Sequence, residues 1–93
     1  MEKTNVSARA KVEIYTSPTC GYCHRAKRLL TNKGVEFEEI SVLMKPDKRR
    51  EMEQRSGGYT VPQIFINGKS VGGSDDLIEL DLDGELDAML GIG

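Results

Sequence analysis

The apolar residues in the first half of the sequence change their spacing several times, and each change predicts a new element. Residues 11–16 alternate apolar and polar side chains and are rich in β-branched residues, which predicts a strand. From 22 to 33 the apolar residues recur with a helical period, and a glycine follows as a stop signal. Residues 35–42 predict a second strand, and 46–56, which begin with proline, predict a second helix. The first three elements form a βαβ unit, so their two strands should be parallel.

The second half of the sequence predicts a hairpin followed by two helices. Residues 63–66 are a short apolar strand, and the dipeptide Asn67-Gly68 is the strongest local signal for a tight hairpin. Residues 69–71 should then be the antiparallel partner strand. The helix expected over 74–82 starts with a serine hydroxyl as its cap and two acids in its first turn. A short final helix is expected over 85–90.

The element order β-α-β-α-β-β-α-α predicts an α/β domain with a four-stranded mixed sheet flanked by helices on both faces. A chain of 93 residues supports one domain and no more. We place this domain at residues 11–93, after a flexible polar N-terminal tail at residues 1–10.

Charge and hydropathy exclude several classes of protein. A formal net charge of -2 argues against a nucleic-acid-binding protein, which usually carries a basic balance. No apolar run approaches the ~18 residues of a membrane span, so no membrane association is expected. Residues 1–10 contain no apolar run of a secretory signal. We therefore expect a cytoplasmic protein in a reducing compartment.

Cys20 and Cys23 are the chain's two cysteines, and they stand where the first strand gives way to the first helix. A thiolate is the attacking form of cysteine, and a helix N-terminus stabilises an anion through its free N–H groups and its dipole. Cys23 lies one turn deeper, on the inner face. The spacing therefore predicts Cys20 as the nucleophile and Cys23 as the resolving thiol.

Three other interpretations of the pair remain open at this point. It could be incidental, although a C-x-x-C that opens a helix after a strand is the context that redox chemistry requires. With His24 it also spells C-x-x-C-H, a haem-attachment pattern that would need an oxidising compartment. Zinc would need more ligands than the two cysteines and His24 provide, and hence a dimer.

Two further segments could bind a ligand. A cis peptide bond in Thr60-Val61-Pro62 would leave the backbone of Val61 free to pair with an extended peptide. The alternative is an ordinary trans proline at the end of a loop. In the segment 72–75, two glycines would allow close approach, the helix N-terminus would attract an anion, and Asp75 could hold an ammonium group. Plain helix capping by Ser74 is the alternative there.

These three pieces in this order resemble the glutaredoxin family: C-x-Y-C followed by His, then T-V-P-x-I-F-I-x-G, then G-G-x-D-D-L. The resemblance covers the chain from about Lys11 onward and is strongest to dithiol glutaredoxins of the short bacterial type. It implies a thioredoxin-like fold, a cis bond before Pro62 and glutathione as co-substrate.

The resemblance also implies roles for individual residues. Tyr22 would flank the glutathione sulfur, Thr60 and Val61 would pair with its cysteinyl part, and Ser74 and Asp75 would hold its γ-glutamyl end. The full implied set of glutathione-binding residues is Tyr22, Arg49, Thr60, Val61, Pro62, Gly73, Ser74 and Asp75. The implied activity is removal of glutathione from mixed disulfides by Cys20 alone and reduction of protein disulfides by both sulfurs. The partners would be glutathione and glutathionylated or disulfide-containing proteins, met by a monomer.

Two positions depart from the family pattern. Ser17 stands where many members carry a lysine for the glycyl carboxylate of glutathione, so that Arg49 would have to serve instead. Gly21 stands where proline is common, and small residues there are similar to members that form dimers bridging a [2Fe-2S] cluster with glutathione. In that alternative function, as a cluster carrier or redox sensor, Cys20 would be a ligand.

A thioredoxin-type electron donor is a third hypothesis. The 72–75 segment and the lack of tryptophan both argue against it.

Overall fold

The computed structural model describes residues 10–92, and within them the predicted order of strands and helices is confirmed. The expected tail, residues 1–10, lies outside the described residues except for Ala10, whose N–H donates to the carbonyl of Leu90. The elements are β1 (Val12–Thr16), α2 (Gly21–Asn32), β2 (Glu38–Ser41), α3 (Pro46–Ser56), β3 (Gln63–Ile66), β4 (Lys69–Gly72), α4 (Ser74–Leu82) and α5 (Leu86–Leu90).

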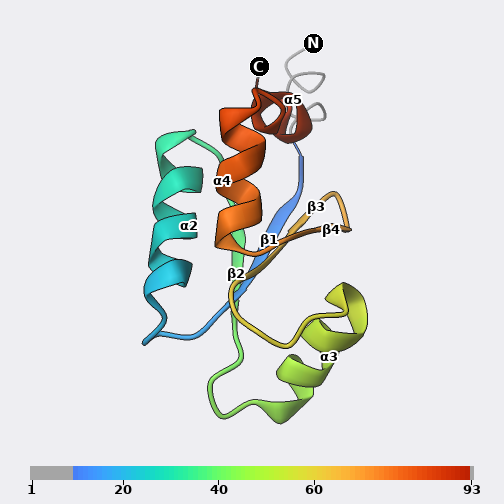
Figure 1. Cartoon of the computed structure of the whole chain (residues 1–93). Coiled ribbons are helices and arrows are strands. Elements are labelled where there is room, and N and C mark those ends of the chain that lie inside the picture. The colour runs from blue at the N-terminus through green and yellow to red at the C-terminus, as the bar shows by residue number, and fades with distance from the viewer. Residues whose placement is uncertain (1–9, 93) are drawn as a thin grey trace.

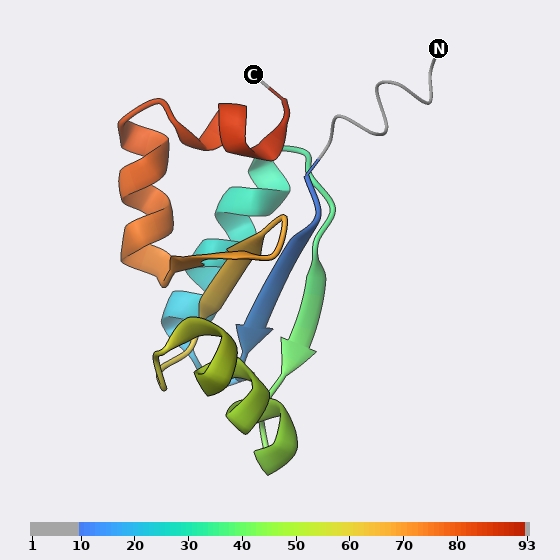
Figure 2. The same cartoon turned by 90° about the vertical axis from the view of Figure 1, so that its right-hand side faces the viewer.

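The strands form a single mixed sheet in the order β2-β1-β3-β4 (Figure 2). β1 runs parallel to β2, with Ile14 opposite Glu39, and antiparallel to β3, with Ile14 opposite Ile64. The hairpin between β3 and β4 turns at Asn67 and Gly68, which have φ angles of 55° and 80°. Two positive φ angles in a two-residue loop are the geometry that Asn-Gly favours, so the predicted hairpin is confirmed.

Helices lie on both faces of the sheet (Figure 1), and the side chains of the strands build a separate core on each face. The larger core lies between the sheet and α2, α4 and α5, and it includes Ile14 and Ile64. The smaller one lies under α3, and its buried members are Tyr15, Val42, Met52 and Phe65. Helices therefore cover both faces, as predicted from the element order.

α3 is held to the sheet more by polar contacts than by apolar ones. Met52 is the helix's one fully buried side chain, whereas Arg55 makes several contacts with the sheet. Its guanidinium lies 4.0 Å from the ring centroid of Phe65, forms a 3.0 Å ion pair with Glu13 and donates to the hydroxyl of Tyr15 at 2.8 Å. These contacts fix the last turn of α3, from which the chain continues toward β3.

The second strand is shorter than predicted, because it begins at Glu38 rather than at residue 35. β2 is an edge strand, so its length is set by its one neighbour, and the paired residues of β1 begin at Glu13 opposite Glu38. Val35 is buried in the larger core without belonging to the strand. None of the helices in residues 10–92 combines the length and apolar character of a membrane span.

Candidate active site

Cys20 caps the first helix with its own sulfur. The residue has extended backbone angles (φ −93°, ψ 115°), and its Sγ accepts a hydrogen bond from the N–H of Cys23 at 3.2 Å. The first turn of α2 contains no acidic residue, so the free N–H groups and the positive end of the helix dipole act on the sulfur without a competing negative charge. The Cys20 sulfur therefore lies at the N-terminus of α2, the position that the sequence predicted for it.

Cys23 is in very different surroundings. It is fully buried on the inner face of α2, whereas Cys20 is partly exposed. Burial, followed by the hydrogen bond with Cys20, raises the pKa of the Cys23 thiol to about 12. Cys23 therefore stays protonated at neutral pH, and Cys20 is the sulfur that a disulfide substrate can reach.

The segment before β3 lies directly beside Cys20. The Val61–Pro62 peptide bond is cis, as the resemblance implied, and the thiol of Cys20 donates to the carbonyl oxygen of Val61 at 3.5 Å. Gln63 is buried, and its side-chain amide donates to the carbonyl oxygen of Thr60 at 3.0 Å. The backbone of this segment is thus held in place next to the sulfur.

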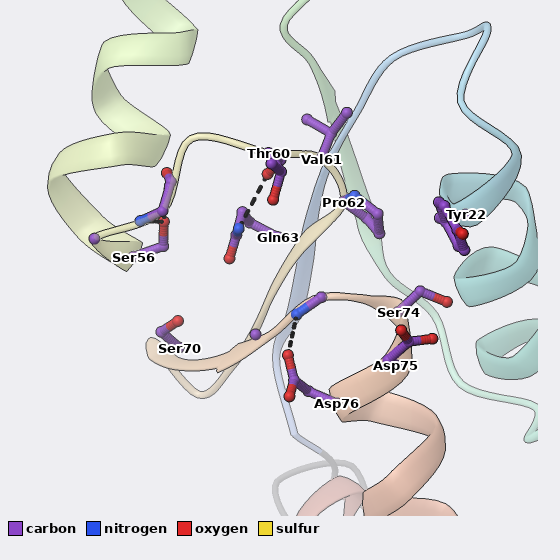
Figure 3. A pocket seen from close by; sticks show the side chains of 14 residues that line it. Tyr22, Ser56, Thr60, Val61, Pro62, Gln63, Ser70, Ser74, Asp75 and Asp76 are labelled. Atoms are coloured by element: carbon purple, nitrogen blue, oxygen red, sulfur yellow. Dashed lines mark hydrogen bonds between the residues drawn. The ribbon is translucent and has the colours of Figure 1, made fainter.

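A pocket with a volume of about 560 Å³ opens beside the start of α2; Tyr22 and Val61 line it, whereas neither cysteine does. Figure 3 shows its walls: Tyr22 comes from the start of α2, Thr60–Pro62 from the segment before β3, Ser74–Asp76 from the start of α4, and Ser56 from the end of α3. The lining residues are Tyr22, Ser56, Gly57, Gly58, Thr60, Val61, Pro62, Gln63, Ser70, Gly72, Gly73, Ser74, Asp75 and Asp76. Seven of the eight predicted glutathione-binding residues therefore line one pocket; Arg49 does not.

The start of α4 differs from the prediction in which residue caps it. Gly73 is the cap position and Ser74 is already the first helical residue, so the serine hydroxyl does not cap the helix. The carboxylate of Asp76 reaches back instead and accepts a hydrogen bond from the N–H of Gly73 at 2.9 Å. Ser74 is buried, and within residues 10–92 its Oγ has no hydrogen-bond partner. That hydroxyl therefore lies beside the pocket without a partner among the described residues.

Arg49 is partly exposed and lies against the loop that precedes Thr60. One guanidinium nitrogen donates to the carbonyl oxygen of Tyr59 at 2.9 Å, just before Thr60. A guanidinium has five N–H donors, so this bond leaves others available. What the structure shows is a contact that supports the loop before β3.

Asp76 and Gln63 are two pocket residues that the sequence reasoning missed. Asp76 could have been found from its spacing, because an acid three residues after a helix cap is the acceptor of a capping box. Gln63 directly follows the Thr-Val-Pro motif, but its inward orientation depends on the fold. The residues that join α3 to β3, 57–58, also line the pocket, and nothing in their composition indicated it.

Nothing in residues 10–92 favours a metal centre, because no three His, Cys, Asp or Glu side chains gather there closely enough to hold an ion. His24 is exposed, and its Nε2 lies 3.1 Å from the carbonyl oxygen of Pro18.

Comparisons with known proteins agree with this geometry. A family model described as Glutaredoxin matches residues 12–71. Glutaredoxin 3 of Escherichia coli (strain K12) is 57% identical over 81 residues, which cover 87% of this chain and 98% of that protein. A solution structure of glutaredoxin from Brucella melitensis is 51% identical, with a TM-score of 0.80 over 92% of this chain and 94% of its own.

A solved complex extends the comparison to a ligand-bound protein. The crystal structure of a buckwheat glutaredoxin–glutathione complex is 31% identical and has a TM-score of 0.80, covering 96% of this chain and 84% of that one. These structural similarities confirm the thioredoxin-like fold. The likeness extends over nearly the whole chain in both sequence and fold.

Proposed function

Because the chain belongs to the glutaredoxin family of thiol–disulfide oxidoreductases, we propose that it uses glutathione to reduce disulfides, with Cys20 as the attacking sulfur. The observation that carries this proposal is the position of the Cys20 sulfur, at a helix N-terminus and 3.5 Å from the carbonyl oxygen of Val61, beside the pocket. A reducing cycle of this kind needs a reduced glutathione pool, so we place the protein in the cytoplasm.

Glutathione fits the pocket as an extended peptide. Its cysteinyl part would pair with the backbone of Val61, with Thr60 and Pro62 beside it, which leaves its sulfur next to Cys20 and Tyr22. Its γ-glutamyl carboxylate would lie at the N-terminus of α4, where Ser74 Oγ is a buried group in need of a partner.

The charged ends of glutathione would meet complementary groups. The γ-glutamyl amine would face the carboxylate of Asp75, with Gly73 allowing the close approach. The glycyl carboxylate would be bound by Arg49. One of its guanidinium nitrogens donates to the Tyr59 carbonyl, and its other N–H groups would donate to the carboxylate.

The first reaction needs Cys20 alone. Its thiolate attacks the glutathione sulfur of a mixed disulfide, a new S–S bond joins Cys20 to glutathione, and the substrate leaves as a thiolate that takes up a proton. A second glutathione then attacks this bond and leaves as oxidised glutathione, which restores Cys20. Reduction of a protein disulfide would instead end with Cys23 attacking the sulfur of Cys20 and releasing the reduced partner.

Two cysteine variants test the proposal in an assay with a small glutathione mixed disulfide, coupled to glutathione reductase. Cys20→Ser should abolish turnover, because Cys20 carries the accessible thiol of the pair. Cys23→Ser should retain deglutathionylation and lose most reduction of a protein disulfide. Loss of both activities in Cys23→Ser would show that the two roles are wrongly assigned, and a wild-type protein without turnover would overturn the proposal as a whole.

A glutathione-bridged [2Fe-2S] dimer is a second candidate, and Gly21 favours it. Nothing lies within 4 Å of the point where a β-carbon at Gly21 would stand, so the surface beside Cys20 is open. Such a cluster needs four ligands, and one chain offers one accessible thiol because Cys23 is buried. The described residues of a single chain therefore do not suffice, and two chains with two glutathione thiols would be needed. A coloured dimer after anaerobic reconstitution with iron and sulfide would support this candidate; a colourless monomer would exclude it.

A further inference from the structure

The resolving step poses an electrostatic problem. Cys23 must carry negative charge when it attacks, yet its thiol is fully buried and its pKa is about 12. Burial in an apolar core disfavours a thiolate, and the hydrogen bond with Cys20 disfavours it further. The attack therefore needs another group that favours the charged form of Cys23.

Lys27 is placed to do this. It stands four residues after Cys23 on α2, and residues at that spacing lie on the same face of a helix, one turn apart. Its side chain is 25% exposed, which brings the ammonium group partly out of water and toward the sheet. Burial and the hydrogen bond with Cys20 raise the pKa of the Cys23 thiol most, and the positive charge of Lys27 acts in the opposite direction with a smaller effect.

The Lys27 ammonium is fixed by two residues of the sheet. Its Nζ lies 3.0 Å from Oε2 of Glu39 on β2, and the same oxygen accepts a 2.7 Å hydrogen bond from the hydroxyl of the buried Thr16. The hydrogen bond from Thr16, followed by that from Lys27, holds the pKa of Glu39 below its usual value. Glu39 is therefore a permanent anion at neutral pH, and it keeps the long lysine side chain under the helix.

The end of β1 adds a second contact to Cys23. Ser17 directly follows Thr16, and a backbone hydrogen bond from Ser17 also lowers the pKa of the Cys23 thiol. A backbone N–H donor and a held ammonium group thus act on Cys23 from the same region, where β1, β2 and α2 meet. Neither Lys27 nor Glu39 lines the glutathione pocket, so they have no part in binding as described above.

We infer that Lys27 stabilises the negative charge that develops on the Cys23 sulfur in the resolving step, with Glu39 and Thr16 as the residues that position it. This inference rests on the proposed function, because it assigns Cys23 the resolving role. In that step the sulfur of Cys23 bonds to that of Cys20, the bond between Cys20 and glutathione breaks, and the departing glutathione thiolate takes up the proton that Cys23 loses. Atoms and electrons balance without a further reactant.

The mixed disulfide between Cys20 and glutathione gives a direct measurement. Reduced protein is mixed with oxidised glutathione, samples are quenched with acid, and mass spectrometry follows the formation and decay of the mixed disulfide. Lys27→Met should slow the decay about tenfold, which corresponds to about 1.4 kcal/mol in the barrier, and should leave the rate of formation within about twofold. Lys27→Arg, which keeps the charge, should restore most of the decay rate.

Three further variants make the result decisive. Arg28→Met removes a charge from the exposed face of the same helix and should leave the decay unchanged, whereas Glu39→Gln should slow it by a smaller factor than Lys27→Met. The inference is overturned if Lys27→Met decays as fast as wild type, or if Lys27→Arg is as slow as Lys27→Met. Cys23→Ser tests the resolving role of Cys23 separately from the effect of Lys27. The mixed disulfide of this variant should persist, and decay at the wild-type rate would show that Cys23 is not the resolving thiol.

Discussion

The carboxylate of Asp76 occupies the space in which a β-carbon at Gly72 would stand. Its Cγ and Cβ lie only 2.7 Å and 2.9 Å from that point, so the whole aspartate side chain would have to move for any larger residue at this position. Gly72 also has a φ angle of 104°, which is a strained region for other residues. The Asp76 carboxylate also accepts a hydrogen bond from the N–H of Gly73. Its contacts with Gly72 and Gly73 therefore connect the end of β4 to the start of α4 beside the pocket.

Gly72→Ala should therefore lower the free energy of unfolding much more than an alanine at another glycine with a positive φ angle. Gly84 has a φ angle of 77° with open space around it, so Gly84→Ala should cost about 1 kcal/mol from backbone strain alone. Gly72→Ala should cost about 2–4 kcal/mol, since strain and the displacement of Asp76 add. Urea denaturation of both variants measures the difference, and equal losses would show that the Asp76 contact is unimportant.

The two adjacent aspartates should separate stability from binding. Asp76→Ala removes the acceptor of the Gly73 N–H and should lower the free energy of unfolding by about 1 kcal/mol. Asp75→Ala removes an exposed carboxylate and should leave stability nearly unchanged while raising the KM for the glutathione mixed disulfide several-fold. Denaturation and steady-state kinetics on both variants test this, and unchanged kinetics in Asp75→Ala would remove that residue from the proposed site.

Iodoacetamide at pH 8 should modify one cysteine of the folded, reduced protein. Cys20 is partly exposed, whereas Cys23 is buried and its pKa of about 12 keeps it a thiol at that pH. Intact-mass measurement should show one added group, and peptide mapping should place it on Cys20. In denaturant both cysteines should react. Two added groups on the native protein would contradict the buried position of Cys23.

The hydroxyl of Tyr15 should contribute stability that depends on pH. It donates to the Glu51 carboxylate and accepts from Arg55, and the bond from Tyr15 is the largest cause that holds the pKa of Glu51 below 4.5. A carboxyl group with a lowered folded-state pKa stabilises the fold above its unfolded pKa, and this contribution disappears as the pH falls through the folded-state value. Tyr15→Phe should thus lose about 1–2 kcal/mol at pH 7 and less near pH 3.

The measurement is urea denaturation of wild type and Tyr15→Phe at both pH values. Tyr59→Phe is the matched control, because Tyr59 is 72% exposed and its variant should behave as wild type at either pH. A loss in Tyr15→Phe that is the same at pH 7 and pH 3 would mean that the hydroxyl acts independently of the Glu51 carboxylate.

The elements with a strong local signal could be predicted from the sequence, and those set by neighbours could not. The Asn67-Gly68 turn depends on two backbone angles that these residues themselves prefer. The start of β2 at Glu38 depends on where its pairing with the parallel strand β1 begins, which is at Glu13. Apolar residues before Glu38 pack into the core and therefore extend the apparent strand pattern beyond its hydrogen-bonded part.

In the candidate site, too, local features could be predicted from the sequence, whereas features that depend on packing could not. The position of Cys20 at the start of a helix could be predicted from the local pattern, and the cis bond before Pro62 from the family resemblance. The capping role of Ser74 was wrong, because Gly73 takes the cap position and turns the serine hydroxyl inward toward the pocket wall. The involvement of Gln63 and of the end of α3 depends on packing between segments far apart in the chain, which periodicity does not report.

The two cores contain different numbers of buried apolar side chains, and this difference affects how easily each side of the molecule opens. The broad apolar layer under α2 and α4 immobilises the cysteine pair, whereas α3 rests on few apolar side chains and a cluster of charged ones. Segments with few buried apolar contacts open at a lower free energy than the rest of a fold. The wall formed by Ser56–Gly58 therefore belongs to the softer half of the molecule. This side of the pocket can therefore widen at a lower free energy than the side that carries the cysteine pair.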